Sequence, residues 1–171
     1  MDKKLKEKAE KIKFLFTDCD GVLTDTGVYY SDRGEELKKF SIRDGMGVEL
    51  LRNMVNIETG IMSGEDLELI RKRASKLKLK EVHLGIKDKK TLMTKILESK
   101  NISFEELAYI GDDINDVEVM EVAGLTACPA DATHYAKNKA DYVCPNKGGQ
   151  GAFRDFVELI IEAKTTHKRK G

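Results

Sequence analysis

The sequence predicts an α/β fold, a three-layer doubly wound parallel sheet with helices on both faces, in a single domain over residues 1–171. Short apolar, β-prone runs alternate along the chain with longer segments whose apolar residues recur at helical spacing. Alternating strands and helices build parallel sheets that are covered on both faces. The chain has neither an internal repeat nor a long linker, so we expect one domain with a proper core.

Each element is predicted from its local pattern. The predicted strands cover residues 14–18, 57–62, 81–84, 107–110, 125–128 and 142–144. The predicted helices cover residues 2–12, 44–55, 65–77, 88–99, 115–122, 132–138 and 152–163, with a single capped turn at 103–106. We expect Asp44 to be the N-cap of its helix, and the basic end at 165–171 to be a flexible tail.

Residues 27–41 interrupt the alternation of strands and helices. Two β-prone runs flank a turn at Asp32-Arg33-Gly34, which predicts a β-hairpin inserted after the first strand. Because an isolated hairpin is only marginally stable in water, we expect this one to pack on something else. A neighbouring subunit is one candidate.

Charge and apolar segments exclude several classes of partner. The chain has 30 Lys and Arg and 30 Asp and Glu, whereas nucleic-acid-binding domains are usually basic, so no nucleic-acid partner is expected. No run approaches the ~20 apolar residues of a membrane span, and the N-terminal residues lack the apolar core of a secretory signal. The cysteines are few and widely spaced, which indicates reduced thiols. We therefore expect a cytoplasmic protein without membrane attachment.

Polar side chains of the kinds that phosphate chemistry needs follow several predicted strands. They are Asp18 and Asp20 after the first strand, Ser63-Gly64 after the second, Lys89 at the start of the helix after the third, and Asp112-Asp113 after the fourth. In a doubly wound sheet these positions share one edge, and carboxylates gathered there suit Mg²⁺. The pair Asp18 and Asp20 alone is equally well interpreted as an acidic turn, so the other positions carry the functional interpretation.

This ordered set resembles the motifs of the haloacid dehalogenase superfamily of phosphohydrolases. Residues 18–25, Asp-Cys-Asp-Gly-Val-Leu-Thr-Asp, match its first motif, Ser63 its second, Lys89 its third, and residues 111–116, Gly-Asp-Asp-Ile-Asn-Asp, its fourth. The match covers nearly the whole chain, and four motifs in order are far more specific than one short motif.

The resemblance implies a two-step phosphoryl transfer with Mg²⁺ as cofactor. Asp18 is implied as the nucleophile that forms an aspartyl-phosphate. Asp20 is implied as the acid that protonates the leaving alkoxide and as the base that then activates water. The implied metal ligands are the Asp18 carboxylate, the Asp20 backbone carbonyl and Asp112. Asp113 and Asp116 are implied to orient waters or the lysine.

The resemblance also implies a set of residues around the phosphoryl group. Ser63, with Gly64, and Lys89 would hold the phosphoryl oxygens and offset their charge. Lys90 is the nearest rival of Lys89, but the Asp88-Lys89 spacing matches the family better.

The spacing between the motifs leaves no room for a cap domain. Only the hairpin and a helix separate the first motif from Ser63, and one helix and one strand separate Ser63 from Lys89. With Arg43-Asp44-Gly45 and the segment 148–154, this resembles the capless branch that acts on phosphates of 3-deoxy-2-ulosonic acids. The resemblance implies a small sugar-acid phosphate as substrate, either 3-deoxy-manno-octulosonate (KDO) 8-phosphate or a KDN or acylneuraminate 9-phosphate. It also implies a homotetramer whose neighbouring subunits help to close the site.

The residues implied to contact the sugar give mixed signals. Glu65 resembles the 9-phosphate type, in which it acts with a lysine that aligns with Lys76, whereas Arg43-Asp44-Gly45 resembles the KDO type. Glu65 is also explained as a carboxylate at a helix N-terminus, and Lys76 and Arg73 as solvated cations on a helix. Arg154 is by default a surface cation, and by resemblance a clamp for the substrate carboxylate.

Other functions fit parts of the pattern. Signalling receiver domains also use Asp, Mg²⁺ and Lys, but they place the acidic pair first, whereas Asp112-Asp113 follows Lys89 here. A catalytically silent assembly domain would not need to retain Asp18 and Asp20. A phosphomutase should need a cap to exclude water. A phosphatase for another small sugar phosphate stays open.

Overall fold

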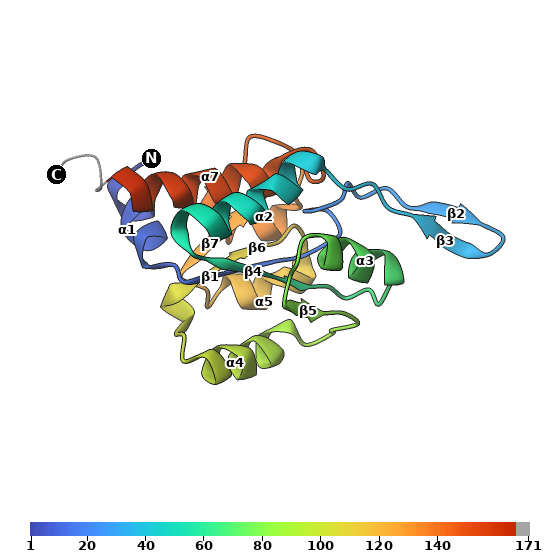
Figure 1. Ribbon diagram of the computed structural model, residues 1–171, viewed down its shortest axis with the longest axis horizontal. Coiled ribbons are helices and arrows are strands. Elements are labelled where there is room, and N and C mark those ends of the chain that lie inside the picture. Colours follow the sequence, from blue (N-terminus) through green and yellow to red (C-terminus); the bar gives the residue numbers. More distant parts are fainter. Residues whose placement is uncertain (167–171) are drawn as a thin grey trace.

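A computed structural model describes residues 1–166 and has one parallel sheet at its centre (Figure 1). The six strands follow the order β5-β4-β1-β6-β7-β8. They are β1 (Phe14–Thr17), β4 (Glu58–Met62), β5 (Glu81–His83), β6 (Leu107–Ile110), β7 (Leu125–Cys128) and β8 (Tyr142–Val143). The chain starts in the middle of the sheet and winds outward in both directions, which confirms the predicted doubly wound α/β fold.

Helices cover both faces of the sheet. They are α1 (Lys3–Lys11), α2 (Ile42–Val55), α3 (Glu68–Lys76), α4 (Lys89–Lys100), α5 (Val117–Met120), α6 (His134–Lys137) and α7 (Ala152–Thr165), with the 3₁₀ turns η1 (Phe104–Glu106) and η2 (Ile114–Asp116). Figure 1 shows α2 and α7 on one face and α4 and α5 on the other. Side chains of β1 alternate between the layers, since Leu15 packs in the core with α2 and α7, while Phe14 and Phe16 pack in the core with α4 and α5.

The strand register brings the ends of the central strands to one edge. Thr17, at the end of β1, lies opposite Ile61 of β4 and Ile110 of β6. The next residue, Asp18, is still tied to the sheet, because its N–H donates to the Ile110 carbonyl at 3.0 Å. Residues that follow these strands are therefore neighbours in space although they are far apart in sequence.

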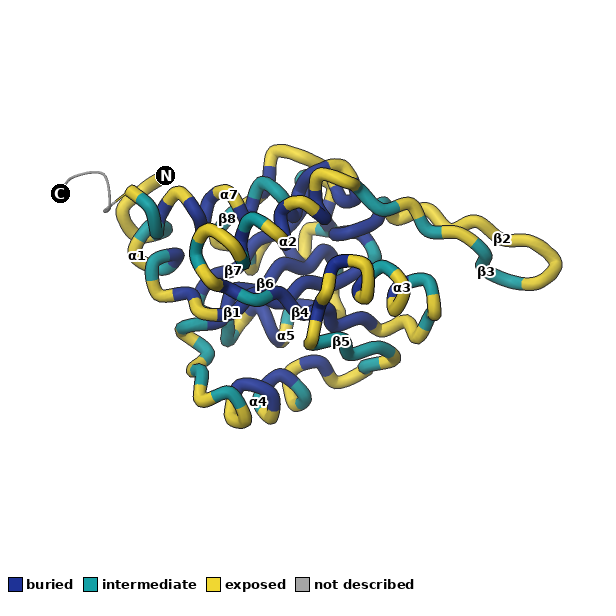
Figure 2. The backbone as a smooth tube through the Cα atoms, in the orientation of Figure 1, coloured by how far each residue is buried: buried dark blue, intermediate teal, exposed yellow. Residues whose placement is uncertain are grey.

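The predicted hairpin stands away from the sheet. It consists of β2 (Tyr29–Ser31) and β3 (Gly34–Leu37), which pair antiparallel. Figures 1 and 2 show it as an extended arm with a mainly exposed surface. Four apolar residues on the arm are each more than half exposed, namely Val28, Tyr29, Tyr30 and Leu37. A bridge between Thr24 and Phe40 closes the base of the arm against the domain.

The start of α2 differs from the prediction. Its N-cap is Ser41 rather than Asp44, because the Ser41 Oγ accepts the Asp44 N–H at 3.2 Å. Asp44 instead joins two helices, since its Oδ1 accepts the Arg154 N–H at 2.9 Å in the first turn of α7.

Other boundaries differ as well. The helix predicted from 65 begins at Glu68, because Leu67 is still extended. The helix predicted over 115–122 is divided into η2 and the short α5. The flexible tail predicted over 165–171 lies outside the described residues except for Thr165, which still belongs to α7, and Thr166, its C-cap.

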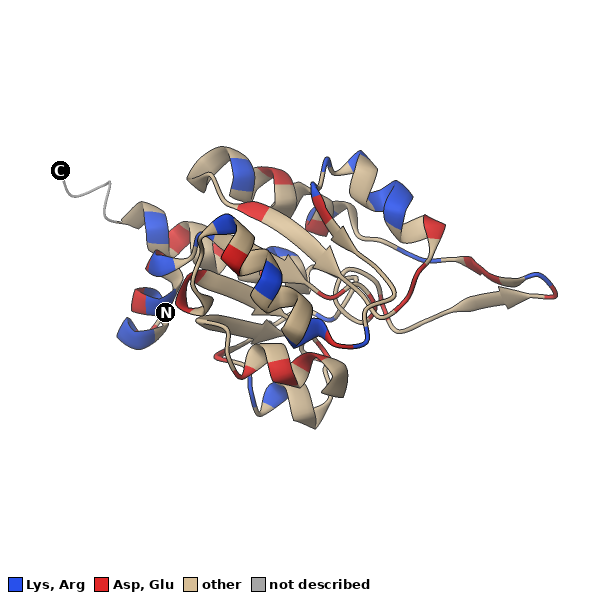
Figure 3. Cartoon of the chain, turned by 90° about the horizontal axis from the view of Figure 1, so that it is seen from below, with Lys and Arg blue, Asp and Glu red and all other residues tan. Residues whose placement is uncertain are grey.

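Within residues 1–166 there is no cap domain. Only the hairpin and α2 lie between β1 and β4, and only α3 and β5 lie between β4 and α4. Figure 3 shows acidic and basic residues interspersed over the helices. No helix in this part of the chain is long and apolar enough to cross a membrane.

Candidate active site

A cavity of about 260 Å³ lies at the carboxyl edge of the central strands. Its lining residues are Asp18, Asp20, Gly21, Thr26, Ser63, Gly64, Glu65, Asp112, Asp113 and Asn115. Two further predicted residues, Lys89 and Asp116, are buried beside the cavity. Lys89 donates to the Asp18 carboxylate, and the Asp116 carboxylate accepts from Lys89 and from the Asp112 N–H. Neither Thr26 nor Asn115 was assigned a role from the sequence. Asn115 lies within the fourth motif, whereas a lone Thr in a turn carries no distinctive sequence signal.

The turn after β1 brings the first motif against the fourth. Asp18 is buried at the end of the strand, and Gly21 then turns the chain with a φ of 82°. A Cβ at Gly21 would lie 2.0 Å from the Asp112 Oδ2. Glycine is therefore required here for both its backbone angle and its size.

A buried lysine ties Asp18 to the fourth motif. The Lys89 Nζ donates to the Asp18 Oδ1 at 2.8 Å and to the Asp116 Oδ1 at 2.7 Å. Lys89 is the first residue of α4, and Asp88 caps that helix by accepting the Thr91 N–H at 2.9 Å. The rival Lys90 is exposed, so the site lysine is Lys89.

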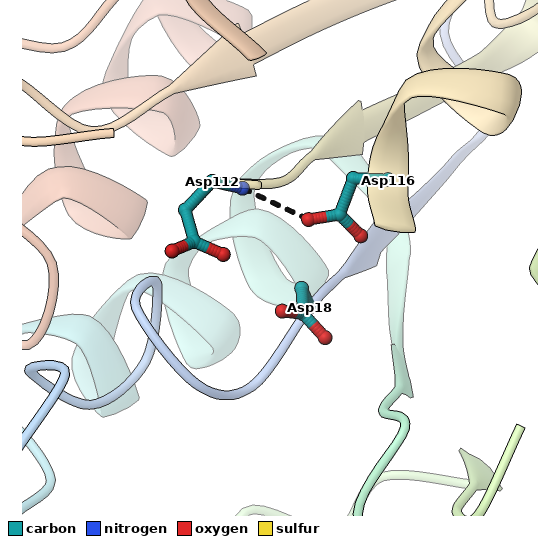
Figure 4. A group of neighbouring side chains, drawn as sticks. All are labelled: Asp18, Asp112 and Asp116. Carbon is teal, nitrogen blue, oxygen red and sulfur yellow. Dashed lines mark hydrogen bonds between the residues drawn. The ribbon is translucent and has the colours of Figure 1, made fainter. Parts of the chain in front are cut away.

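Asp116 organises the loop after β6. Its Oδ1 accepts from Lys89 and, at 2.6 Å, from the Tyr109 hydroxyl, and its Oδ2 accepts the Asp112 N–H at 2.9 Å. The Asp113 N–H also points to that Oδ2, at 3.4 Å. Because both of its oxygens are occupied by protein donors, Asp116 positions other groups. Figure 4 shows the hydrogen bond from the Asp112 N–H to the Asp116 carboxylate, with Asp18 beside the two residues. Tyr109 was missed because it lies within an apolar strand.

Two of these carboxyl groups, those of Asp18 and Asp112, hold their protons unusually tightly. Burial, followed by the negative charge of Asp116, raises the pKa of Asp18 to about 7, although Lys89 opposes the shift. Burial and the charges of Asp18 and Asp116 raise the pKa of Asp112 to about 8. The single ammonium of Lys89 therefore does not offset the negative charge of the group, and a further cation would stabilise it.

The donor set fits a hard divalent cation. Carboxylate oxygens of Asp18, Asp112 and Asp116 lie within 4.8 Å of one another. In the part of the chain described, the Asp112 carboxylate accepts no hydrogen bond, and Asp18 gives only its Oδ1 to Lys89. Oxygen donors with negative charge are the ligands that Mg²⁺ prefers. Asp18 and Asp112 are therefore the carboxylates available to a metal, and Asp116 lies behind them.

Asp20 lines the cavity but has a separate set of contacts. Its Oδ1 accepts from the Lys38 Nζ at 2.7 Å and from the Thr24 hydroxyl at 3.1 Å. Its Oδ2 has no hydrogen-bond partner among the described residues. Lys38 belongs to the base of the hairpin, and its role was missed because nothing in a lysine-rich stretch marks one lysine for burial.

The second motif closes another side of the cavity. Ser63 is buried, and its Oγ accepts the Glu65 N–H at 3.1 Å. Glu65 also lines an adjoining cavity of about 250 Å³ that is bordered by hairpin residues, among them Tyr30 and Lys38. The two cavities together extend from the carboxylates toward the hairpin.

Three residues predicted to contact the substrate are not brought to this cavity. The Arg73 guanidinium lies over the Phe40 ring and donates to the Ser41 carbonyl at 2.8 Å. Lys76 is exposed in the last turn of α3. Arg154 pairs with Glu158 at 2.7 Å and lines a different cavity. Within one copy of the chain, their ordinary surface or packing roles account for them.

Known proteins match most of this chain in sequence. A family model described as haloacid dehalogenase-like hydrolase matches residues 56–154, which include the second, third and fourth motifs. The chain is 38% identical over 160 residues to the 3-deoxy-D-manno-octulosonate 8-phosphate phosphatase KdsC of Haemophilus influenzae, covering 94% of this chain and 88% of that protein. It is also 38% identical over 157 residues to the KdsC of Escherichia coli K12, covering 92% and 83%.

Solved structures resemble the fold over nearly its whole length. One is the cobalt-bound deoxy-D-mannose-octulosonate 8-phosphate phosphatase of Haemophilus influenzae, with a TM-score of 0.88, 38% identity, and 92% and 91% of the two chains covered. Another is the 3-deoxy-D-manno-octulosonate 8-phosphate phosphatase of Moraxella catarrhalis in complex with a magnesium ion, a phosphate ion and KDO. Its TM-score is 0.93 at 29% identity, with 99% and 97% of the two chains covered.

Proposed function

The chain belongs to the haloacid dehalogenase-like hydrolases and is a phosphatase, and from this premise we propose that it hydrolyses KDO 8-phosphate with Mg²⁺ as cofactor. The observation that carries the proposal is the position of Asp18. Its carboxylate lines the cavity, accepts from the buried ammonium of Lys89, and lies within 4.8 Å of the Asp112 carboxylate, which accepts no hydrogen bond from residues 1–166. This arrangement suits a nucleophile that attacks a phosphate beside a metal ion.

We propose that Asp18 and Asp112 would hold Mg²⁺ through their carboxylates, with the Asp20 backbone carbonyl as a third ligand. Bound there, the ion would supply positive charge for the phosphoryl oxygens and for the nucleophile. The phosphatase of Moraxella catarrhalis, solved in complex with both a magnesium ion and a phosphate ion, supports this choice of metal.

In the proposed first step, a carboxylate oxygen of Asp18 attacks phosphorus as the bond to the sugar oxygen breaks, which gives an aspartyl-phosphate. Lys89 keeps Asp18 in place and offsets charge on the group. Ser63, at the cavity wall, is suited to donate to a phosphoryl oxygen. Asp20 gives its proton to the leaving sugar oxygen.

In the proposed second step, Asp20 takes a proton from water as the water oxygen attacks the phosphorus of the intermediate. The bond between phosphorus and Asp18 then breaks, which releases inorganic phosphate and restores the free carboxylate. Because one residue serves in both steps, its protonation state alternates within each turnover.

KDO 8-phosphate is proposed as the substrate because relatives with high coverage bear that activity in their names. Glu65 favours a second candidate, a KDN or acylneuraminate 9-phosphate, because this acidic residue lines both cavities. Rates measured side by side on the three phosphates separate these candidates. Equal and poor activity on all of them would refute the substrate class while leaving the phosphatase assignment intact.

We propose that the protein is a cytoplasmic homotetramer whose neighbouring subunits contact the hairpin. The exposed apolar residues of the arm support association, since such residues are costly in water. A second row of apolar residues, Ile42, Met46 and Met54, is exposed along α2, which begins just after the hairpin. Light scattering of the purified protein gives the number of subunits directly.

The catalytic proposal is tested by phosphate release from KDO 8-phosphate with wild type and Asp18→Asn protein, each with Mg²⁺ and with a chelator. We expect turnover only for wild type with the metal. Release that persists in Asp18→Asn protein, or without divalent metal, would contradict the mechanism. A wild type that forms a tetramer but hydrolyses no phosphate ester would favour the silent assembly domain.

A further inference from the structure

The side chain of Lys38 is buried, although it lies at the end of an exposed hairpin. Only 2% of the side chain is exposed, whereas that of the next residue, Lys39, is 54% exposed. Lys38 reaches back to the domain, where its Nζ lies 2.7 Å from the Asp20 Oδ1 and 2.8 Å from the Glu35 Oε1. Burying a long flexible cation in this way is costly unless it is paired, so these contacts fix its position.

Lys38 contacts only one of the two carboxylate oxygens of Asp20. Its ammonium and the Thr24 hydroxyl both donate to Oδ1, while Oδ2 has no partner within residues 1–166. The donors therefore fix the rotation of the carboxyl group. They also leave Oδ2 as the only oxygen on which a proton can sit without meeting another donor.

We propose that Lys38 is a positioning residue that orients Asp20 for proton transfer through its Oδ2. This inference rests on the proposed function, in which Asp20 is the acid and then the base. In the first step the Oδ2 proton passes to the sugar oxygen as its bond to phosphorus breaks. In the second step a proton of the attacking water returns to Oδ2, so the carboxyl group ends the cycle as it began.

A direct role for Lys38 in binding phosphate fits the contacts less well. Two carboxylates already occupy its ammonium, namely those of Asp20 and Glu35. Burial opposes its charge, but the hydrogen bond that it donates to Asp20 and the nearby negative charge of Glu35 outweigh burial and raise its pKa. Lys38 therefore remains a fixed cation that acts on Asp20, whereas Lys89 contacts the carboxylates of Asp18 and Asp116.

The test is a double-mutant cycle between Lys38 and Asp20, measured as kcat for KDO 8-phosphate. Lys38→Met alone should lower kcat by about 10- to 100-fold with little change in KM, because a misplaced catalytic group costs up to ~100-fold. Asp20→Asn alone should lower kcat by about 10²- to 10⁴-fold. The double variant should be within about twofold of Asp20→Asn, because Lys38 has nothing left to position.

Thr24→Val provides a second cycle in case Lys38→Met does not fold, which its thermal transition would reveal. It removes the other donor to Oδ1 without changing charge, and its effect should likewise vanish in Asp20→Asn protein. Lys39→Met is the matched control, since Lys39 pairs with Asp25 on the surface and its loss should leave kcat within about twofold in either background.

The inference would be overturned if the fold losses in kcat of the single variants multiply in the double variants, or if kcat is unchanged in Lys38→Met and Thr24→Val protein. In either case an active wild type would still uphold the proposed function. An inactive wild type would instead refute the proposed function and the inference with it.

Discussion

Among the described residues, Lys89 is the only lysine whose ammonium contacts the buried carboxylates of Asp18 and Asp116. Replacing Lys89 by methionine removes that ammonium. Its Nζ lies 2.8 Å from the Asp18 Oδ1 and 2.7 Å from the Asp116 Oδ1, and both partners are buried. Methionine keeps much of the length and volume of the side chain, so packing changes little. The perturbation is therefore chiefly electrostatic.

The expected loss of stability is large. Removing one partner of a buried ion pair costs about 3–5 kcal/mol, because the other charge stays buried without compensation. For a chain of 171 residues, an unfolding entropy of ~2.1 cal/mol/K per residue converts this loss into a lowering of Tm by about 8–14 °C. Lys90→Met is the control, because Lys90 is the exposed neighbour, and we expect a change below about 0.5 kcal/mol.

The loss should depend on pH. The pKa of Asp18 is raised from 3.8 to about 7, and that of Asp112 from 3.8 to about 8. The folded protein therefore binds more protons than the unfolded chain between these values, and its stability without metal falls as pH rises from about 4 to about 8. Without Lys89 that fall should be steeper, because the ionised carboxylates then repel one another unopposed. At pH 5 both carboxyls are protonated, and the cost of the substitution should shrink.

Thermal unfolding by circular dichroism, at pH 5 and pH 8 in the presence of a chelator, measures these effects. Saturating Mg²⁺ should restore part of the lost stability at pH 8, since a ligand that binds only the folded state stabilises it. A Tm lowered by less than about 3 °C, or lowered equally at both pH values, would refute the electrostatic reasoning. A comparable loss in Lys90→Met would do so as well.

Three further results are expected. Mg²⁺ binding to the metal-free protein at pH 6 should release about two protons, from Asp18 and Asp112, so that the affinity for Mg²⁺ rises toward pH 8. Calorimetry in buffers of different ionisation enthalpy tests this, and equal affinity at pH 6 and pH 8 would contradict it. Gly148→Ala should lower the free energy of unfolding in urea by about 1–3 kcal/mol and should lower kcat, because the new Cβ would lie 1.9 Å from the Gly21 carbonyl oxygen. An unchanged free energy of unfolding and an unchanged kcat would show that the loop moves freely. Tyr30→Lys, at an exposed site on the hairpin, should dissociate the proposed tetramer with little change in the stability of the monomer, and an unchanged mass by light scattering would place the interface elsewhere.

The sequence predicted which segments are strands and which residues follow them. The strands at Leu107–Ile110 and Leu125–Cys128 have their predicted bounds, because a short apolar run between turn residues is a local signal. Four motifs in order then located Asp18, Ser63, Lys89 and Asp112 at one edge of the sheet. Helix starts were less predictable, as at Ser41, because several polar residues in a row can each serve as a cap.

The contacts that complete the site depend on the tertiary structure. The bond between Lys38 and Asp20 spans 18 residues, and that between Lys89 and Asp18 spans 71. No local pattern distinguishes Lys38 from Lys39, because the choice depends on which side chain the hairpin turns toward the domain. Arg154 likewise could not be placed from sequence, and the structure pairs it with a glutamate of its own helix.

The two aspartates of the first motif, Asp18 and Asp20, show what the sequence contributes and what the tertiary structure contributes. By itself the sequence determined that Asp18 and Asp20 follow the first strand of the chain, because apolar pattern and turn residues act over a few neighbouring positions. Only the folded chain decided that one carboxylate contacts Lys89 and the other Lys38, because packing of distant elements determines which cation reaches which oxygen. The separate roles proposed for the two residues follow from that difference.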